Sequence, residues 1–227
     1  MTHDIGDRQP AATAGVVSRP LWLTTRDDVT LEAETTLPDA PWVSVVLAHP
    51  HPLYGGSMRS LVISELFRLL PQWGLAAVRF NFRGVEGSGG QHGGGRAERL
   101  DVEAAIEATA ATVPGSPIVL AGWSFGADVA ATVLDPRISG WFLIAPPLRV
   151  LPDEAFVAAS DPRPKHLCVP ERDEFNPPPS ARARTAGWVN TEVEVVPGAD
   201  HFLVGRTDAV AASLMAFAEA IAVDPPT

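Results

Sequence analysis

Short apolar runs alternate with amphipathic stretches along most of this chain. The run 42–48 is continuous and rich in β-branched residues, which is typical of a strand covered on both faces. The stretch 59–73 then places leucines at helical spacing and ends before Gly74, and 75–82 is the next predicted strand. This order predicts strands and helices in alternation.

The alternation continues to the end of the chain. We predict a helix over 96–111, a strand over 116–123 and a helix over 125–134. Three further strands are predicted, over 140–146, 165–169 and 191–196. Two further helices are predicted, one around 180–187 and one over 207–222. Two strands near the start, 20–25 and 29–37, form a predicted hairpin, and the glycine content of 83–95 marks a loop. Such alternation implies right-handed crossovers and a mostly parallel sheet with helices on both faces, so the fold class is α/β.

Composition narrows the class of protein. The 227 residues fit a single domain over 20–227 behind a loose N-terminal tail over 1–19. The formal net charge of -10 argues against nucleic acid as a partner. The one cysteine, Cys168, excludes an internal disulfide and fits a reducing compartment. No apolar run is long enough to span a membrane and the N-terminus lacks signal-peptide features, so we expect a cytoplasmic protein.

The segment 122–126 carries the strongest chemical signal. Gly122, Ser124 and Gly126 match the pattern G-x-S-x-G, between a predicted strand and a predicted helix. A serine on such a tight turn has a strained backbone, and the small neighbours let the chain segments pass. Its hydroxyl then stands at the carboxyl edge of the sheet, beside a helix N-terminus that favours developing negative charge. Ser124 is therefore the candidate nucleophile.

A nucleophilic serine needs a base, and the base needs an orienting acid, in the chain order serine, acid, histidine. His201 follows the last predicted strand, which is the expected place for the base. Asp173 lies just beyond the strand 165–169 and is preferred as the acid over Glu171 and Glu174. Asp200 adjoins the histidine in sequence and is expected to be structural.

Taken together, these motifs resemble those of the α/β-hydrolase superfamily, in particular the small, nearly capless group that is similar to dienelactone hydrolases and bacterial serine esterases. The resemblance rests, in order, on HPHPLYGGS, RFNFRGVEGSGG, GWSFGA, ERDEFNPP and GADHF, and it spans about residue 20 to the end. It implies an α/β-hydrolase fold with a minimal lid, and a small-molecule ester or thioester as substrate. It implies no cofactor.

The resemblance also implies where an oxyanion would be bound. One donor is the backbone N–H of Phe125, after the nucleophile, and the other comes from the loop HPHPLYGG. Many relatives have HG where this chain has HP, so the donor falls on the following residue, His51, between two prolines that lack an N–H. Tyr54 and Trp123 are candidates for the wall of the substrate pocket. Asp128 departs from the family pattern, one helical turn after the nucleophile, and we expect it to be solvated or paired.

His49 and His51 also raise the possibility of a metal site. A metal site needs a third ligand and usually a fourth, and no HxxxH pattern, cysteine or spaced carboxylates accompany these histidines, so we predict none. His49 is expected to be a structural histidine. Arg83 and Asp101 flank the glycine loop and are expected to pair, while Cys168 is expected in the core.

The sequence therefore predicts a serine hydrolase that cleaves a small or medium ester or thioester. Two alternatives stay open. One is a lyase or isomerase that uses His201 as a base without an acyl-enzyme, because the scaffold supports such chemistry too. The other is a non-catalytic binding module. The sequence leaves the oligomeric state open, with a homodimer among the options.

Overall fold

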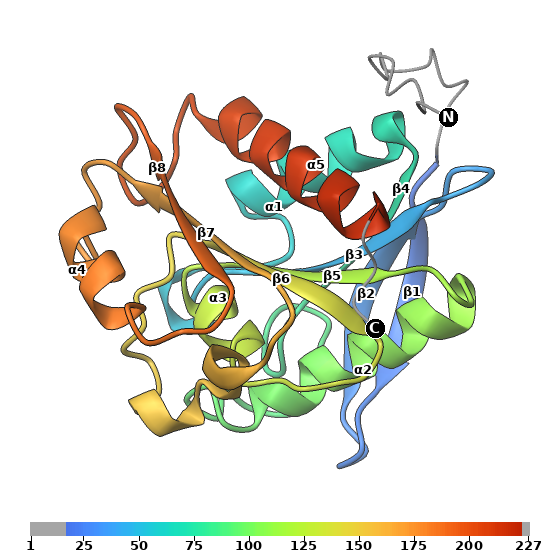
Figure 1. Cartoon of the computed structure of the whole chain (residues 1–227). Coiled ribbons are helices and arrows are strands. Elements are labelled where there is room, and N and C mark those ends of the chain that lie inside the picture. Colours follow the sequence, from blue (N-terminus) through green and yellow to red (C-terminus); the bar gives the residue numbers. More distant parts are fainter. Residues whose placement is uncertain (1–16, 224–227) are drawn as a thin grey trace, which may run out of the picture.

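A computed structural model describes residues 17–223 and shows a twisted central sheet with helices on both sides (Figure 1). Over these residues the sheet has eight strands in the order β1-β2-β4-β3-β5-β6-β7-β8. The strands are β1 (Arg19–Thr24), β2 (Thr30–Thr36), β3 (Val43–Ala48), β4 (Leu75–Phe80), β5 (Ile118–Trp123), β6 (Ile138–Ile144), β7 (Lys165–Pro170) and β8 (Thr191–Val196). All pairs from β4 to β8 are parallel, and β1 and β2 add an antiparallel edge. The fold is the predicted α/β-hydrolase fold.

The helices lie over two separate apolar cores, one on each face of the sheet. On one face α2 (Glu98–Thr112), α3 (Phe125–Ala130) and α4 (Pro178–Arg184) pack against the sheet. On the other, α1 (Leu61–Leu69) and α5 (Thr207–Val223) cover it. Strand β3 is buried along its whole length, which explains its continuous apolar sequence.

Two helices are shorter than the sequence predicts. Helix α1 ends at Leu69 and continues as the 3-10 turn η2 (Leu70–Trp73), because Pro71 cannot donate the next helical hydrogen bond. Helix α3 ends at Ala130 rather than at residue 134. The Ala131 carbonyl accepts from the N–H of Ala158, so the chain after α3 is fixed by a contact with a distant segment.

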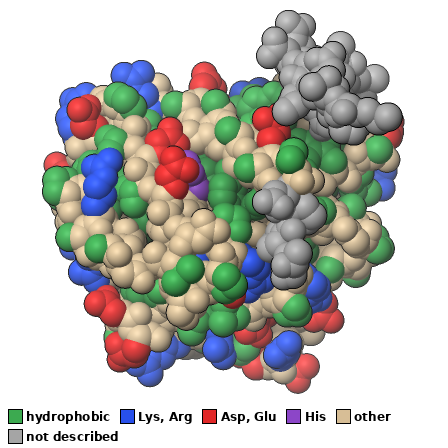
Figure 2. Space-filling view, in the orientation of Figure 1, with side chains coloured by type: hydrophobic (Ala, Val, Ile, Leu, Met, Phe, Trp, Pro, Cys, Tyr) green, Lys and Arg blue, Asp and Glu red, His purple; other side chains and the backbone are tan. Residues whose placement is uncertain are grey.

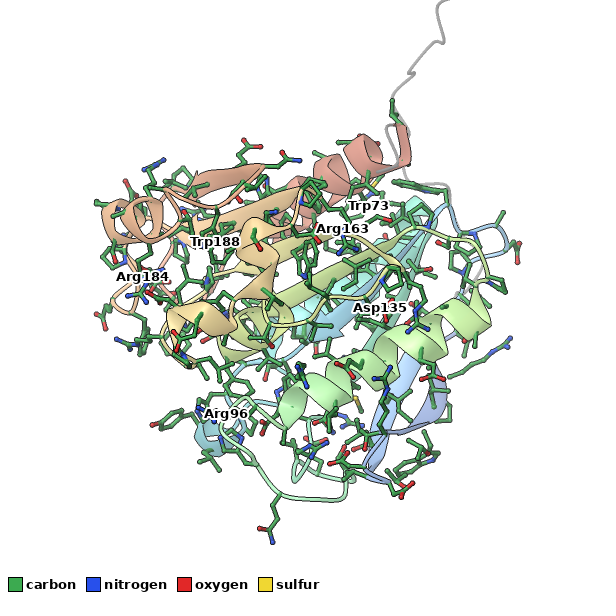
Figure 3. The ribbon with its side chains drawn as sticks, turned by 60° about the horizontal axis from the view of Figure 1, so that its bottom comes forward. Trp73, Arg96, Asp135, Arg163, Arg184 and Trp188 are labelled. Carbon is green, nitrogen blue, oxygen red and sulfur yellow. The ribbon has the colours of Figure 1, made fainter. Side chains whose placement is uncertain are left out.

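The segment between β6 and β7 is short and lies flat on the body of the protein. It contains two 3-10 turns, η3 (Asp153–Ala155) and η4 (Val157–Ser160). Phe156 packs against Trp188, and Arg163 donates to the carbonyl of Asp135 at 2.7 Å. Both Trp188 and Arg163 are labelled in Figure 3. The expectation of a minimal lid is thus confirmed.

Charged side chains of both signs are spread over the face shown in Figure 2. The described residues include no helix with the length and apolar character needed to cross a membrane. Most of the predicted tail, 1–16, lies outside the described residues, and β1 already begins at Arg19.

Candidate active site

Ser124 stands on the tight turn between β5 and α3. Its backbone has φ 54° and ψ -120°, a left-handed conformation that side chains rarely adopt. A Cβ on Gly122 would lie 2.3 Å from the carbonyl oxygen of Gly126, and one on Gly126 would lie 2.3 Å from that of Ala48. Both positions therefore require glycine, because another part of the backbone passes too close to leave room for a Cβ atom. The sequence pattern predicts this.

Three side chains from distant parts of the chain meet at this turn. The Nε2 atom of His201 lies 2.9 Å from Oγ of Ser124, and its Nδ1 atom lies 2.9 Å from Oδ2 of Asp173. Asp173 and His201 are buried, while Ser124 is partly exposed. This is the geometry in which a histidine can take the serine proton while a carboxylate fixes its tautomer.

The backbone after β7 holds Asp173 in place. Its second carboxylate oxygen, Oδ1, accepts hydrogen bonds from the N–H groups of Phe175 at 2.8 Å and Asn176 at 3.2 Å. The alternative acids are arranged differently. Glu171 accepts from the N–H of Gly198 at 2.7 Å, and Glu174 is exposed. Of the three carboxylates, Asp173 is therefore the one that contacts the imidazole.

The loop that carries His201 is fixed from two directions. Asp200 accepts hydrogen bonds from the N–H groups of Phe202 and Leu203, which confirms its structural role. The indole N–H of Trp123 donates to the carbonyl of His201 at 3.3 Å. Trp123 is buried in the core under α1 and α5, so its contacts support the histidine loop rather than the pocket wall that the sequence predicted.

Neither of the two backbone N–H groups expected as oxyanion donors has a hydrogen-bond acceptor among the described residues. Phe125 is the first residue of α3, so its N–H has no acceptor within the helix. Among the described residues, the N–H of His51 likewise donates to no protein group. By contrast, the next two amides are engaged. The N–H of Leu53 donates to Nδ1 of His51 at 3.2 Å, and that of Tyr54 donates to the His51 carbonyl at 3.1 Å.

The ring of His51 packs in a cluster of rings that includes Phe125, the residue after Ser124. It lies 4.8 Å from the ring of Phe125, 4.7 Å from that of Tyr54 and 5.1 Å from that of His92. Burial, together with the nearby His92, lowers the pKa of His51. Tyr54, at the outer end of this cluster, is exposed at the surface.

Sequence reasoning did not place His92 near the site. Glu98 explains its position, because this fully buried carboxylate accepts from the N–H groups of Gly93 and Gly95 and lies 2.8 Å from Nδ1 of His92. Glu98 thereby folds the end of the glycine loop against the site. A glutamate in the first turn of a helix that follows a glycine run was the available signal.

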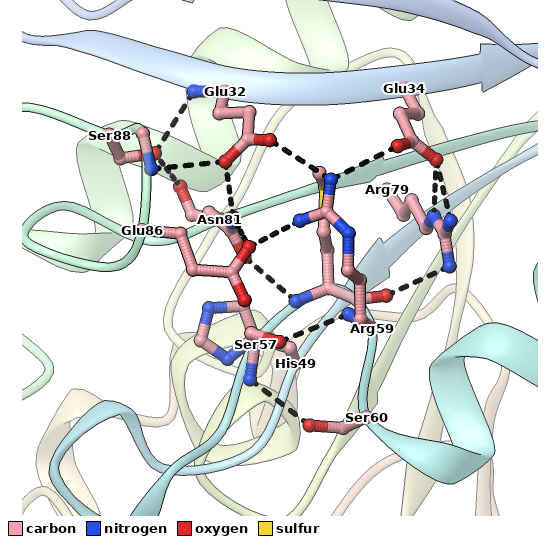
Figure 4. A network of polar contacts seen from close by, with 12 residues as sticks. Glu32, Glu34, His49, Ser57, Arg59, Ser60, Arg79, Asn81, Glu86 and Ser88 are labelled. Atoms are coloured by element: carbon pink, nitrogen blue, oxygen red, sulfur yellow. Dashed lines mark hydrogen bonds and ion pairs between the residues drawn. The ribbon is translucent and has the colours of Figure 1, made fainter.

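A polar network supports the loop HPHPLYGGS from behind (Figure 4). His49 is fully buried, its Nε2 accepts from the N–H of Phe82 at 3.0 Å, and Nδ1 lies 2.6 Å from the carbonyl of Pro50. Burial lowers the pKa of His49 to about 4. Beside it, Asn81 accepts from the N–H of Met58 at 2.8 Å and donates to Glu32. The expectation of a structural role for His49 is confirmed.

Asp128 is buried and paired rather than solvated. Its carboxylate accepts from the N–H groups of Leu148, Arg149 and Val150 at 2.8 to 3.0 Å. Burial raises the pKa of Asp128 to about 6, although the hydrogen bonds from these three N–H groups act to lower it. Its oxygens are thus directed at the loop after β6, which Asp128 holds in position.

The predicted pair at the glycine loop and the predicted core cysteine are also confirmed. Arg83 donates from Nε and Nη2 to Asp101 at 2.9 and 2.7 Å, and a second carboxylate, Asp27, contacts the same guanidinium. Cys168 is fully buried.

Comparison with known proteins agrees with this architecture. The alpha/beta hydrolase domain family matches residues 42–222. An uncharacterized protein of Rickettsia prowazekii is 30% identical over 187 residues, which cover 78% of this chain and 77% of that protein.

Two solved structures are similar over most of the chain. An alpha-beta serine hydrolase homologue from Coxiella burnetii has a TM-score of 0.76 and 30% identity, covering 88% of this chain and 96% of its own. A serine hydrolase without a lid from Xanthomonas campestris has a TM-score of 0.81 and 25% identity, covering 96% of this chain and 100% of its own. The chain therefore belongs to the alpha/beta hydrolase family, which indicates that it is a hydrolase.

Proposed function

We propose that this protein hydrolyses a carboxylic ester or thioester of small or medium size through an acyl-enzyme on Ser124. The observation that carries the proposal is the hydrogen-bonded line from Ser124 Oγ through the His201 ring to Asp173, with a length of 2.9 Å at each step. Belonging to the alpha/beta hydrolase family supports the same reaction class.

The proposed reaction has two halves. His201 takes the proton of Ser124 as its oxygen attacks the carbonyl carbon, and the N–H groups of Phe125 and His51 stabilise the oxyanion that forms. The intermediate collapses, and the alcohol or thiol leaves with the proton from His201. Water, deprotonated by His201, then attacks the acyl-enzyme, and the acid is released with Ser124 restored.

Apolar side chains around the site support an acyl group of modest size. Tyr54 and Leu53 are exposed on the His51 side, while Phe175 and Phe202 are exposed on the other, with rings 4.4 and 5.7 Å from the His201 ring. The short segment between β6 and β7 leaves no element large enough to form a lid domain. An open rim of apolar side chains suits a soluble ester with a short acyl group better than an ester with a long lipid chain.

The test is turnover of p-nitrophenyl acetate, butyrate, octanoate and palmitate, with matched acyl thioesters. We expect the short and medium chains to be cleaved and Ser124→Ala to lose at least about a thousandfold in kcat. Asp173→Asn should lose a large part of the activity because the imidazole loses its orienting partner, while the matched change Glu174→Gln should keep it. Absence of turnover on both series, or full activity in Ser124→Ala, would refute the proposal.

A further inference from the structure

A second group of reactive side chains lies on the face of the sheet that α1 and α5 cover, where β7 and β8 meet α5. His166 and Cys168 are two residues apart on β7 and share a face, and Glu194 is the partner of Cys168 in the β7–β8 register. One nitrogen, one sulfur and one carboxylate oxygen from these residues all lie within 4.8 Å of one another.

We propose that His166, Cys168 and Glu194 bind a divalent zinc ion. Imidazole nitrogen, thiolate and carboxylate are the three ligand types that zinc uses in proteins. The Oε2 atom of Glu194 lies 2.8 Å from Nε2 of His166 and 3.7 Å from Sγ of Cys168. Zinc–ligand bonds of about 2.0 to 2.3 Å in a tetrahedron place neighbouring ligand atoms about 3.5 Å apart. The nitrogen–oxygen distance is shorter than this spacing and the sulfur–oxygen distance is slightly longer. Water would take the fourth position.

The surrounding residues orient the ligands as metal sites require. Glu194 lies 2.8 Å from Nε2 of His166 and Glu192 lies 3.6 Å from Nδ1, so a metal would take the place of the proton between Nε2 and Glu194. The ring of Phe142 stacks on the imidazole at 5.2 Å with an interplanar angle of 4°. From α5, Ser213 donates to Oε1 of Glu194 at 2.9 Å and leaves Oε2 facing the other two ligands.

The three side chains can exchange protons for the ion, which can reach them from solvent. Binding forms the zinc–sulfur, zinc–nitrogen and zinc–oxygen bonds and releases the thiol proton, and any Nε2 proton, to solvent with no change of oxidation state. The side chain of Glu194 is 38% exposed, so the ion can reach the site from solvent.

Cobalt titration of the metal-free full chain, without an affinity tag, tests the site. The chain has a single cysteine, so a thiolate-to-cobalt charge-transfer band in the near ultraviolet can come only from Cys168. We expect such a band to saturate at one cobalt per chain, to be displaced by zinc, and to accompany a higher melting temperature.

Two matched variants complete the test. Cys168→Ser should lose the band and the stabilisation by zinc, with an unchanged circular dichroism spectrum showing that it is folded. Ser124→Ala should bind cobalt like the wild type, so this result is independent of the proposed esterase activity. Absence of a charge-transfer band in the wild type at saturating cobalt would overturn the proposal and leave His166 and Glu194 as a hydrogen-bonded pair. Equal zinc stabilisation of wild type and Cys168→Ser would overturn it as well.

Discussion

His51 combines the backbone N–H that we propose as an oxyanion donor with a side chain that packs on Phe125. We expect His51→Ala to keep substantial activity, because only the ring is lost. His51→Pro removes the N–H itself, and losing one oxyanion donor costs on the order of a hundredfold in kcat, about 3 kcal/mol. Esterase kinetics on the two variants, after a check for equal melting temperatures, give the comparison.

The two variants distinguish a role of the His51 backbone N–H from a role of the His51 side chain. If His51→Ala is as inactive as His51→Pro, the imidazole takes part in the chemistry. If both are active, another group stabilises the oxyanion. The engaged amides of Leu53 and Tyr54 argue against those two residues as the substitute.

His49 gives a prediction about stability and pH. Its pKa is lowered from 6.5 to about 4 in the fold, so the unfolded chain binds more protons between these values and stability falls as the pH falls through that window. Between about pH 7.5 and about pH 5 this group should reduce the free energy of unfolding by about 2 kcal/mol. Urea unfolding at both pH values measures the difference.

His49→Gln is the matched variant, because its side-chain oxygen can still accept from the Phe82 N–H that His49 binds. The variant should lose this part of the pH dependence while other titrating groups affect both proteins alike. An unchanged pH dependence in His49→Gln would show that His49 is not the group responsible.

At the scale of secondary structure, the sequence predicted every strand of the described sheet. The buried parallel strands have a distinctive apolar pattern, and β1 and β2 were predicted as a hairpin. The ends of helices were less predictable. Helix α3 stops at Ala130, and the Ala131 carbonyl accepts from the N–H of Ala158, a residue far along the chain. No local pattern carries such a contact. For the same reason the sequence indicated that Asp128 was unusual but did not reveal its three partners.

Asp128 joins α3 to the loop after β6, and its removal should loosen that connection. Asp128→Ala leaves three amide groups without their acceptor, at about 1 to 3 kcal/mol for each that stays buried, so we expect a loss of about 3 kcal/mol or more in the free energy of unfolding. Asp128→Asn keeps one carbonyl oxygen as acceptor and should lose less. Glu107→Ala, an exposed change on α2, should stay within about 0.5 kcal/mol of the wild type. Chemical denaturation that ranks Asp128→Ala with Glu107→Ala would contradict the assigned role.

At the scale of the whole molecule, the order of residues along the chain predicted three candidate active-site residues that the structure brings together. Ser124, Asp173 and His201 follow strands whose carboxyl ends share one edge, so their proximity follows from topology once the fold is known. The cluster of His166, Cys168 and Glu194 had no such signal. It depends on the register of β7 against β8, which spacing along the chain does not encode.

The two sites predict different responses to metal removal. Ester hydrolysis should survive prolonged treatment with EDTA, because the proposed reaction uses protein groups alone, whereas the melting temperature should fall if zinc was bound at β7 and β8. Esterase assays and thermal unfolding before and after chelation measure both. Loss of activity that added zinc restores, with no change in melting temperature, would place a metal in the reaction itself.

The central claim is that Ser124 is a nucleophile activated by His201, and a covalent probe tests it most directly. Wild-type protein incubated with a fluorophosphonate should gain the mass of one phosphonyl group, and peptide mapping should locate it on Ser124. Ser124→Ala should gain none, and His201→Ala should react far more slowly because the base is missing. An unmodified wild-type protein, or an adduct on another residue that persists in Ser124→Ala, would contradict the account.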